Sequence, residues 1–377
     1  MKPTKTDAFM PHGHPIYVMA KPVGSRCNLR CSYCYYLQKG AGMMDESLLE
    51  TFIRQYTEAQ TSAEVLFTWH GGEPLLLPIS YYERALQLQQ KYAHGRHVDN
   101  CLQTNGTLLT DEWCRFFRQN NFLVGISIDG PASMHSRYRQ QFDRVLHGIE
   151  LLKRHGVMWN AMATIHQANA DEPEAFYQFF KNIGCEYLQF TPIVEQTGGQ
   201  LTPESVTPQQ WGTFLTRLYD LWIREDVGRV FVQLFDATLA NWVGQPPGVC
   251  SMGALCGHSA ALQPDGSLYS CDHFVFPEYR LGNIREQTIT ELMYGERQLR
   301  FGRNKLDGIA EKCKDCPYLF ACHGECPKNR ILPGGENYLC EGYRFFFRHV
   351  TPTMDFMAQE IVAGRAPANV MSLYNRD

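Results

Sequence analysis

The sequence predicts an α/β fold, a partial (β/α)6 barrel followed by a smaller cysteine-rich domain. From residue 16 to about residue 228, short apolar runs rich in β-branched residues alternate with amphipathic stretches, which is the pattern of strands alternating with helices. The alternation stops after residue 229, and eight of the 14 cysteines follow that point. We therefore expect a barrel domain at residues 1–229 and a cysteine-rich domain with a closing C-terminal helix at residues 230–377.

Six runs have the length and composition of β-strands, and each precedes a stretch with helical periodicity. The strands are expected at residues 16–21, 64–70, 97–104, 123–129, 157–165 and 187–194. The helices are expected at residues 45–56, 81–93, 111–120, 144–156, 174–184 and 208–225. Strands joined through helices run parallel, so these units predict a parallel, barrel-like sheet whose chemistry lies in the loops after the strands.

The last third of the chain has a different pattern. The segment "GQPPGVC", residues 244–250, contains two prolines and two glycines and marks a boundary. Residues 260–272, "AALQPDGSLYSCD", predict a β-hairpin because a Pro-Asp-Gly turn separates two short apolar runs. Residues 341–366 have the pattern of a long closing helix.

Composition narrows the class of protein. A net charge of −4 and an isoelectric point near 6.4 provide no broad basic surface for nucleic acid. No apolar run approaches the roughly 18 residues of a membrane helix, and the first 22 residues lack the apolar core of a secretion signal. We therefore expect a soluble cytoplasmic protein that binds neither nucleic acid nor membranes, in which clustered cysteines indicate metal or redox chemistry.

The segment "CNLRCSYCYY" follows the first predicted strand and brings Cys27, Cys31 and Cys34 close together. An iron–sulfur cubane needs four ligands, so three thiolates leave one iron open, and an open metal position indicates chemistry. This CxxxCxxC spacing resembles that of radical S-adenosylmethionine enzymes, in which the cofactor's amino and carboxylate groups bind the fourth iron. A zinc site completed by His12 or His14 is the alternative.

The same resemblance implies cofactor contacts in the loops after the first two predicted strands. Tyr36 matches an aromatic residue that contacts the cofactor beside the cluster. The segment "GGEP" resembles the site for the methionyl amino group, which implies contacts from Gly71, Gly72, Glu73 and Pro74. The residue before it, His70, stands where some relatives carry Gln, so its contact with substrate or cofactor is left open.

Two further cofactor contacts are expected after the fourth predicted strand, in "SIDGPASMHSRYR". Ser127 at the strand end suits the ribose. Arg139 suits the carboxylate, because a guanidinium binds a carboxylate through two hydrogen bonds. Arg137 and Arg144 are alternatives for the same role.

The C-terminal cysteines have the spacing C-x5-C-x14-C, then C-x2-C-x5-C-x3-C-x13-C. Together with the N-terminal loop they provide 11 thiolates, one fewer than three [4Fe-4S] clusters need. The pattern resembles the SPASM extension of radical S-adenosylmethionine enzymes. That resemblance implies one auxiliary cluster on Cys250, Cys256, Cys271 and Cys326, and another on Cys313, Cys316, Cys322 and Cys340. A pair of zinc ribbons, with His258, His273 or His323 as further ligands, is the alternative.

Two segments resemble the anaerobic sulfatase-maturating enzymes: "SLYSCDHFVFPEYRLGNI" at residues 267–284 and "ENYLCEGYRFFFRH" at residues 336–349. The resemblance implies oxidation of a Cys or Ser in a sulfatase Cys/Ser-x-Pro-x-Arg segment to formylglycine. It also implies three [4Fe-4S] clusters, S-adenosyl-L-methionine, an unfolded or nascent sulfatase polypeptide, and a one-electron donor such as flavodoxin or ferredoxin. Asp272 matches the proposed base, and we expect burial beside a cluster ligand to raise its pKa.

Two other functions are compatible with parts of this pattern. A SPASM peptide maturase that forms thioether or carbon–carbon crosslinks would use the same set of clusters. A non-catalytic electron-transfer or zinc-ribbon protein would need neither the "GGEP" segment nor an open coordination position, so these two features favour an enzyme.

Overall fold

The computed structural model describes residues 15–374, which places the zinc candidates His12 and His14 outside the described residues. The chain forms two compact units. The first unit comprises the described residues up to Ser127 together with Arg139–Trp159 and Leu255–Asn304. The second comprises Ile128–Tyr138, Asn160–Ala254 and the described residues from Lys305 onward.

The first unit contains the first four predicted strands as parallel neighbours. These are β1 (Tyr17–Ala20), β2 (Glu64–Trp69), β3 (His97–Thr104) and β4 (Leu123–Ser127). The predicted hairpin also belongs to this unit, as β10 (Ser259–Leu262) and β11 (Ser267–Tyr269), followed by β12 (Arg280–Asn283). Strand β10 pairs in parallel with β1, with Ala20 opposite Leu262, so the hairpin extends the barrel sheet instead of standing apart.

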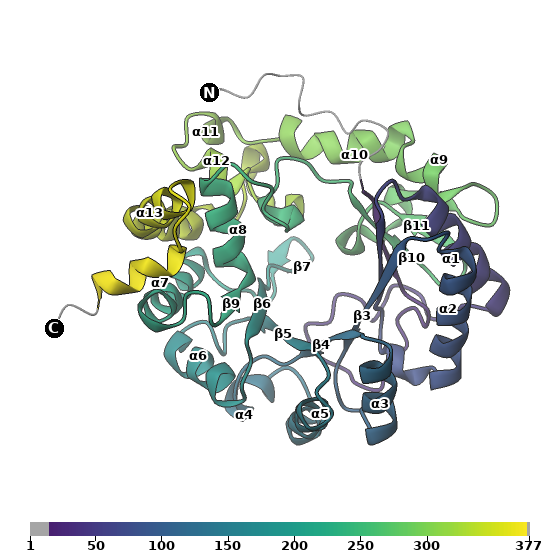
Figure 1. Cartoon of the computed structure of the whole chain (residues 1–377). Helices are drawn as coiled ribbons and strands as arrows, with labels where there is room; N and C mark the ends of the chain where they lie inside the picture. The colour runs from purple at the N-terminus through teal and green to yellow at the C-terminus, as the bar shows by residue number, and fades with distance from the viewer. Residues whose placement is uncertain (1–14, 375–377) are drawn as a thin grey trace. The chain divides into compact units, whose positions relative to one another are not determined.

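The helices of the first unit cover one face of these strands. They are α1 (Glu46–Ala59), α2 (Ile79–Tyr92), α3 (Asp111–Gln119), α5 (Phe142–Arg154), α9 (Ile289–Met293) and most of α10 (Glu296–Asp307), with the 3-10 turns η1 (Pro74–Leu76), η3 (Asp272–Phe274) and η4 (Pro277–Tyr279). Helices α1 and α2 pack side by side (Figure 1). Every second residue of β2, namely Val65, Phe67 and Trp69, is buried, because alternate side chains of a strand point to opposite faces.

The second unit contains the fifth and sixth predicted strands, β5 (Trp159–Ile165) and β6 (Tyr187–Pro192), and the short β9 (Phe231–Val232) parallel to β6. Its main helices are α6 (Pro173–Asn182), α7 (Pro208–Glu225), α8 (Gln233–Trp242) and α13 (Cys340–Val362). Shorter elements are α4 (Ala132–His135), β7 (Gln196–Thr197), β8 (Gln200–Leu201), η2 (Cys250–Met252), α11 (Glu311–Lys314), α12 (Leu319–Cys322), η5 (Pro327–Asn329), η6 (Pro333–Gly335) and η7 (Pro367–Leu373).

All six predicted strands and the six helices after them are present, as are the hairpin and the closing helix. The pair β9 and α8 lies beyond the point where we expected the alternation to stop. A strand of two residues is too short to show a periodic pattern, which explains why the sequence did not reveal it. No helix in the described part of the chain has the length and apolar character needed to cross a bilayer.

Helices α7 and α13 of the second unit lie side by side (Figure 1), and two glycines set their separation. A Cβ atom on Gly342 would lie 2.3 Å from the carbonyl oxygen of Pro208, and one on Gly212 would lie 2.9 Å from the Cα of Gly342. Both distances are shorter than a van der Waals contact, so the two backbones approach as closely as they do only because side chains are missing there.

We expect Gly342→Ala to destabilise the protein although Ala is the better helix former. Alanine would contribute up to about 1 kcal/mol through helix propensity, whereas forcing the two helices apart costs about 1–3 kcal/mol. A lower thermal unfolding midpoint of the anaerobically purified protein checks this. Gln359→Ala, at an exposed position of the same helix, is the control and should leave the midpoint nearly unchanged; a higher midpoint for Gly342→Ala would contradict the packing argument.

Candidate active site

The loop after β1 carries Cys27, Cys31 and Cys34, and the loop after β2 holds it in place. The Gly72 amide donates to the Gly24 carbonyl at 2.7 Å, and the Glu73 amide donates to the Arg26 carbonyl at 2.8 Å. A Cβ atom on Gly72 would lie 2.0 Å from the Arg26 oxygen, and Gly71 has a φ of +128°. Both glycines of "GGEP" are therefore required by the contact between these two loops, in addition to the cofactor contact predicted for them.

The loop after β3 also contacts the cysteine loop. Asn105 donates from Nδ2 to Asn28 Oδ1 at 2.8 Å and to the sulfur of Cys27 at 3.7 Å. The Leu29 amide donates to the same sulfur at 3.3 Å. Burial raises the pKa of the Cys27 thiol, and these N–H groups oppose that rise because they favour the thiolate.

The donor set of this loop fits an iron–sulfur cluster. Thiolates are its usual ligands, and N–H groups that donate to the sulfur stabilise such ligands. None of the 14 cysteines, all of which lie in the described part of the chain, forms a disulfide. The three cysteines predicted to bind the first cluster are therefore available as ligands.

Glu73 is completely buried at the junction of these loops. Its carboxylate accepts hydrogen bonds from the Leu75 amide at 2.9 Å, the Thr104 hydroxyl at 2.7 Å and the Asn105 amide at 2.8 Å. Burial raises the pKa of Glu73, and these three bonds oppose that rise. A carboxylate has about four acceptor positions, so these three hydrogen bonds leave one position unused, and the contact of Glu73 with the cofactor ammonium stays a prediction.

Arg139 and Ser127, two further predicted cofactor contacts, also belong to the first unit. Arg139 is half-buried and donates from Nε to the hydroxyl of Tyr33, within the cysteine loop, at 2.9 Å. Its alternatives Arg137 and Arg144 are exposed, which favours Arg139 for the predicted role. Ser127 Oγ accepts from Gln103 at 2.9 Å.

The buried Tyr36 links the cysteine loop to the segment after β10. It donates from its hydroxyl to Gln263 Oε1 at 2.8 Å. Burial raises its pKa well above the usual value, so the phenol is neutral and acts only as a hydrogen-bond group. The contact fixes the cysteine loop against the turn between β10 and β11.

Asp272 forms a buried ion pair that sequence reasoning missed. The ammonium of Lys21, which is completely buried, lies 2.5 Å from Asp272 Oδ1. The hydroxyl of Tyr35 donates to Asp272 Oδ2. Both oxygens of the carboxylate are therefore held by the end of β1 and the cysteine loop.

The predicted direction of the Asp272 pKa shift is wrong. Burial by itself would raise the pKa, as we expected. The positive charge of Lys21 is the largest opposing effect, and it holds the pKa well below its usual range. Asp272 is therefore a carboxylate at neutral pH, and the lowered pKa makes it a weaker base than an ordinary carboxylate.

His70 completes this cluster of side chains. Its Nδ1 lies 3.0 Å from the Lys21 ammonium and accepts from the Gly71 amide at 2.7 Å. Since a backbone N–H can only donate, Nδ1 carries no proton. Burial, followed by the charge of Lys21, lowers the pKa of His70 to about 3. His70 is thus a neutral acceptor that fixes Lys21.

The pairing of β10 with β1 brings these residues together. The Lys21 amide donates to the Leu262 carbonyl at 2.9 Å, and the chain then turns through β11 to Asp272. Gln298 holds the Ser270 carbonyl at 3.1 Å, just before Cys271. In the sequence, the one sign of this ion pair is the lysine that ends the apolar run "IYVMAK", and the sequence does not indicate which residue pairs with it.

The four C-terminal cysteines that are predicted to hold one auxiliary cluster all belong to the second unit: Cys313, Cys316, Cys322 and Cys340. Burial raises the pKa of Cys322 to about 12, with further contributions from Glu325, Cys340 and Cys313. Mutual repulsion between thiolates is what a bound metal cluster relieves, so this group of cysteines fits the predicted cluster.

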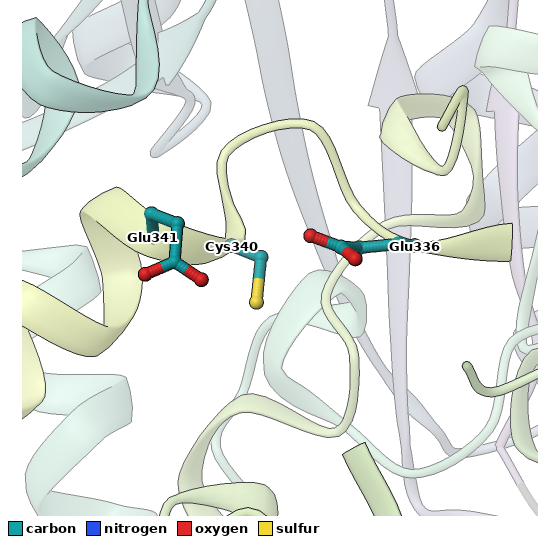
Figure 2. Close-up of side chains that lie close together, drawn as sticks. All are labelled: Glu336, Cys340 and Glu341. Carbon is teal, nitrogen blue, oxygen red and sulfur yellow. The ribbon is translucent and has the colours of Figure 1, made fainter. Parts of the chain in front are cut away.

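Cys340 lies between two carboxylates, those of Glu336 and Glu341 (Figure 2). The ammonium of Lys312 pairs with both, Glu336 closely and Glu341 at 3.4 Å. One cation thus screens the thiolate of Cys340 from its acidic neighbours. The other predicted set is divided, with Cys256 and Cys271 in the first unit and Cys250 and Cys326 in the second. Both ligand sets stay predictions.

The N-terminal and C-terminal parts match two family models. Residues 22–180 match the radical SAM superfamily, and residues 255–317 match the SPASM iron–sulfur cluster-binding domain. A serine-type anaerobic sulfatase-maturating enzyme of Bacteroides thetaiotaomicron is 52% identical over 97% of both chains. The chain belongs to the anaerobic sulfatase-maturating enzymes. A cysteine-type member of this family from Clostridium novyi is 33% identical, over 91% of this chain and 97% of its own length.

Solved structures agree with this assignment. Native anSMEcpe with bound AdoMet and the Kp18Cys peptide superposes with a TM-score of 0.86 at 31% identity, over 92% of this chain and 100% of that one. Streptococcus suis SuiB bound to the precursor peptide SuiA gives 0.64 at 13% identity, over 86% and 75%, which shows a shared fold only. The predicted family, and the predicted α/β fold with a cysteine-rich C-terminal domain, are therefore confirmed.

We expect Gly72→Ala to displace the cysteine loop, because the new methyl group would overlap the Arg26 carbonyl. Fewer irons per chain after anaerobic reconstitution, with little change in helix content, would be the result. Iron and sulfide analysis together with circular dichroism checks it. Gly95→Ala, at an exposed position with a φ of +82°, adds backbone strain there but no clash within 4 Å of the new Cβ, and should keep full iron; equal iron in both variants would contradict the loop contact.

We expect Lys21→Met to destabilise the protein strongly, because it leaves the Asp272 carboxylate buried without its cation. Breaking a buried pair from one side typically costs about 3–5 kcal/mol. Lys91→Met removes a lysine that is 59% exposed and paired with Glu50, and should cost less than about 1 kcal/mol. Thermal unfolding midpoints compare the two, and similar midpoints for both variants would contradict the ion pair's importance.

Proposed function

We propose that this protein oxidises a Ser or Cys side chain in a sulfatase Cys/Ser-x-Pro-x-Arg segment to formylglycine without oxygen. The observation that carries the proposal is the 52% identity to a serine-type sulfatase-maturating enzyme over 97% of both chains. The structural match to a relative whose solved form contains AdoMet and a peptide supports it. So does the carboxylate of Asp272, which is held beside the cysteine loop.

Three [4Fe-4S] clusters and S-adenosyl-L-methionine are the cofactors of this proposal. Cys27, Cys31 and Cys34 would hold the first cluster, and the eight C-terminal cysteines the two auxiliary ones. When bound, these groups supply a 5′-deoxyadenosyl radical that takes a hydrogen atom from the target Cβ, and an acceptor for one electron.

The chain's own residues bind and orient the cofactor, and they deprotonate the target side chain. Glu73 would receive the cofactor ammonium, Arg139 its carboxylate and Ser127 its ribose. Asp272 would take the proton of the target hydroxyl or thiol, while Lys21 and Tyr35 keep both carboxylate oxygens in place. Loss of a hydrogen atom, a proton and an electron converts Ser directly to the aldehyde. Cys gives a thioaldehyde, which water hydrolyses to the aldehyde with release of sulfide.

A serine target has the better support. Serine-type relatives are 52% and 37% identical to this chain, and a cysteine-type relative is 33% identical. The assay should contain one peptide with Ser and one with Cys at the target position, because the two target residues need the same hydrogen abstraction and the same base.

The remaining parts of the proposal rest on the sequence. A flavodoxin or ferredoxin would donate the single electron, and the substrate would be an unfolded or nascent sulfatase polypeptide in the cytoplasm, without a role for nucleic acid or a membrane. We place the boundary between the barrel and the SPASM domain near residue 229.

We expect the reduced protein to convert a sulfatase peptide of about 17 residues with Ser at the target position to the formylglycine product, with S-adenosylmethionine consumed. Mass spectrometry of the peptide, followed by reaction of the product with a hydrazine, identifies the aldehyde. A peptide with Ala at the target position is the control. Cofactor cleavage without any aldehyde from either the Ser or the Cys peptide would overturn the proposed function.

Asp272→Asn leaves the buried Lys21 without its anion, so we expect a lower thermal unfolding midpoint. Below that midpoint, and per iron-loaded chain, we expect the variant to cleave the cofactor without peptide as the wild type does, and to form formylglycine about 10²–10⁴ times more slowly, the usual contribution of a general base. Liquid chromatography of 5′-deoxyadenosine measures cofactor cleavage, and mass spectrometry of the peptide measures formylglycine formation. Asp99→Asn, at a site that is 51% exposed, should retain the wild-type rate. An undiminished aldehyde yield from Asp272→Asn would refute the role of Asp272 as base.

A further inference from the structure

Lys305 is a completely buried cation in the second unit, in the last turn of α10. Its ammonium donates to two main-chain carbonyls, those of Cys250 and Ser251, each at 2.7 Å. No carboxylate in the described part of the chain forms an ion pair with it. A buried charge is costly unless an opposite charge compensates it, so the position of this lysine calls for an anion.

The neighbouring ionisable groups do not supply that anion by direct contact. Glu325 is buried, but the side-chain amides of Asn329 and Asn337 hold its carboxylate, at 3.2 and 2.8 Å. His323 is either neutral or positively charged, so its ring cannot supply the anion. Neither of these two side chains is therefore a counter-ion in direct contact with Lys305.

Arg330 adds a second positive charge of the same kind. Its guanidinium donates to the carbonyls of Lys305 at 2.7 Å, His323 at 3.1 Å and Gly324 at 3.1 Å. None of its contacts is with a carboxylate. Two cations bound only by carbonyls thus lie among cysteines of the SPASM domain, where a cluster with four thiolates would bring net negative charge.

We propose that Lys305 is the positive charge that raises the reduction potential of the auxiliary cluster held by Cys250. This inference rests on the proposed function, which assigns Cys250 as a cluster ligand. Reduction adds one negative charge to a cluster, and a nearby cation in a medium of low dielectric constant stabilises the reduced form more than the oxidised form. A raised potential suits an electron acceptor in the oxidation of the substrate.

Lys305→Met and Lys305→Gln test the proposal, because both remove the charge and Gln keeps one hydrogen-bond donor. Each reconstituted full-length variant is titrated anaerobically with a chemical reductant, and electron paramagnetic resonance follows each cluster. We expect one auxiliary transition to move to a more negative potential in both variants, with the other two transitions unmoved. Arg300→Gln is the control, because it removes an equal charge from the same helix at a site that is 66% exposed, and it should leave all three transitions at their wild-type potentials.

A fully loaded Lys305→Met whose three transitions match the wild type would overturn the proposal. If the neutral variants fail to load one cluster, Lys305→Arg decides. Full iron in Lys305→Arg supports a need for positive charge at this position. A loss of iron equal to that of the neutral variants overturns the proposal. The titration contains no peptide, so it is independent of aldehyde formation: a protein that made no formylglycine could still show the shift, and an active enzyme could still lack it.

Discussion

The buried ion pair between Lys21 and Asp272 is the interaction on which the organisation of the first unit depends. A lysine and a carboxylate with so little access to water are tolerated only as a pair, so each fixes the position of the other. The pair joins the end of β1 to the hairpin that carries Cys271. It thereby ties a residue of the cysteine-rich segment to the loop of the first cluster, and the parallel pairing of β10 with β1 provides the frame.

The same constraint explains the neighbouring side chains. His70 is neutral and uses Nδ1 to accept from Lys21, and Tyr35 is a neutral phenol that donates to Asp272. Because His70 and Tyr35 are both neutral, neither adds a further charge beside the ion pair. A carboxylate held in this way is a weaker base than one with a raised pKa, but it is always in its ionised form and correctly oriented, and orientation is a large part of what a general base contributes.

Positive charge recurs beside the cysteines of the second unit. Lys312 lies between the two carboxylates that flank Cys340, and Lys305 and Arg330 bind carbonyls around Cys250 and His323. Clusters with four thiolates are anionic, so a protein that holds several of them needs compensating cations near the ligands. These side chains show how the fold distributes that charge, and they distinguish the surroundings of Cys250 from those of Cys340.

The sequence by itself determined the alternating strands and helices, the cysteine motif after β1 and the spacing of the C-terminal cysteines, because each of these patterns is local. Only the tertiary structure decided that the hairpin joins the barrel sheet, that Lys21 reaches Asp272, and that this carboxyl group has a lowered pKa. The physical reason is distance along the chain: Tyr35 and Asp272, for example, are 237 residues apart. Charge pairing and the close approach at Gly72 come from contacts between distant segments, which no local pattern records.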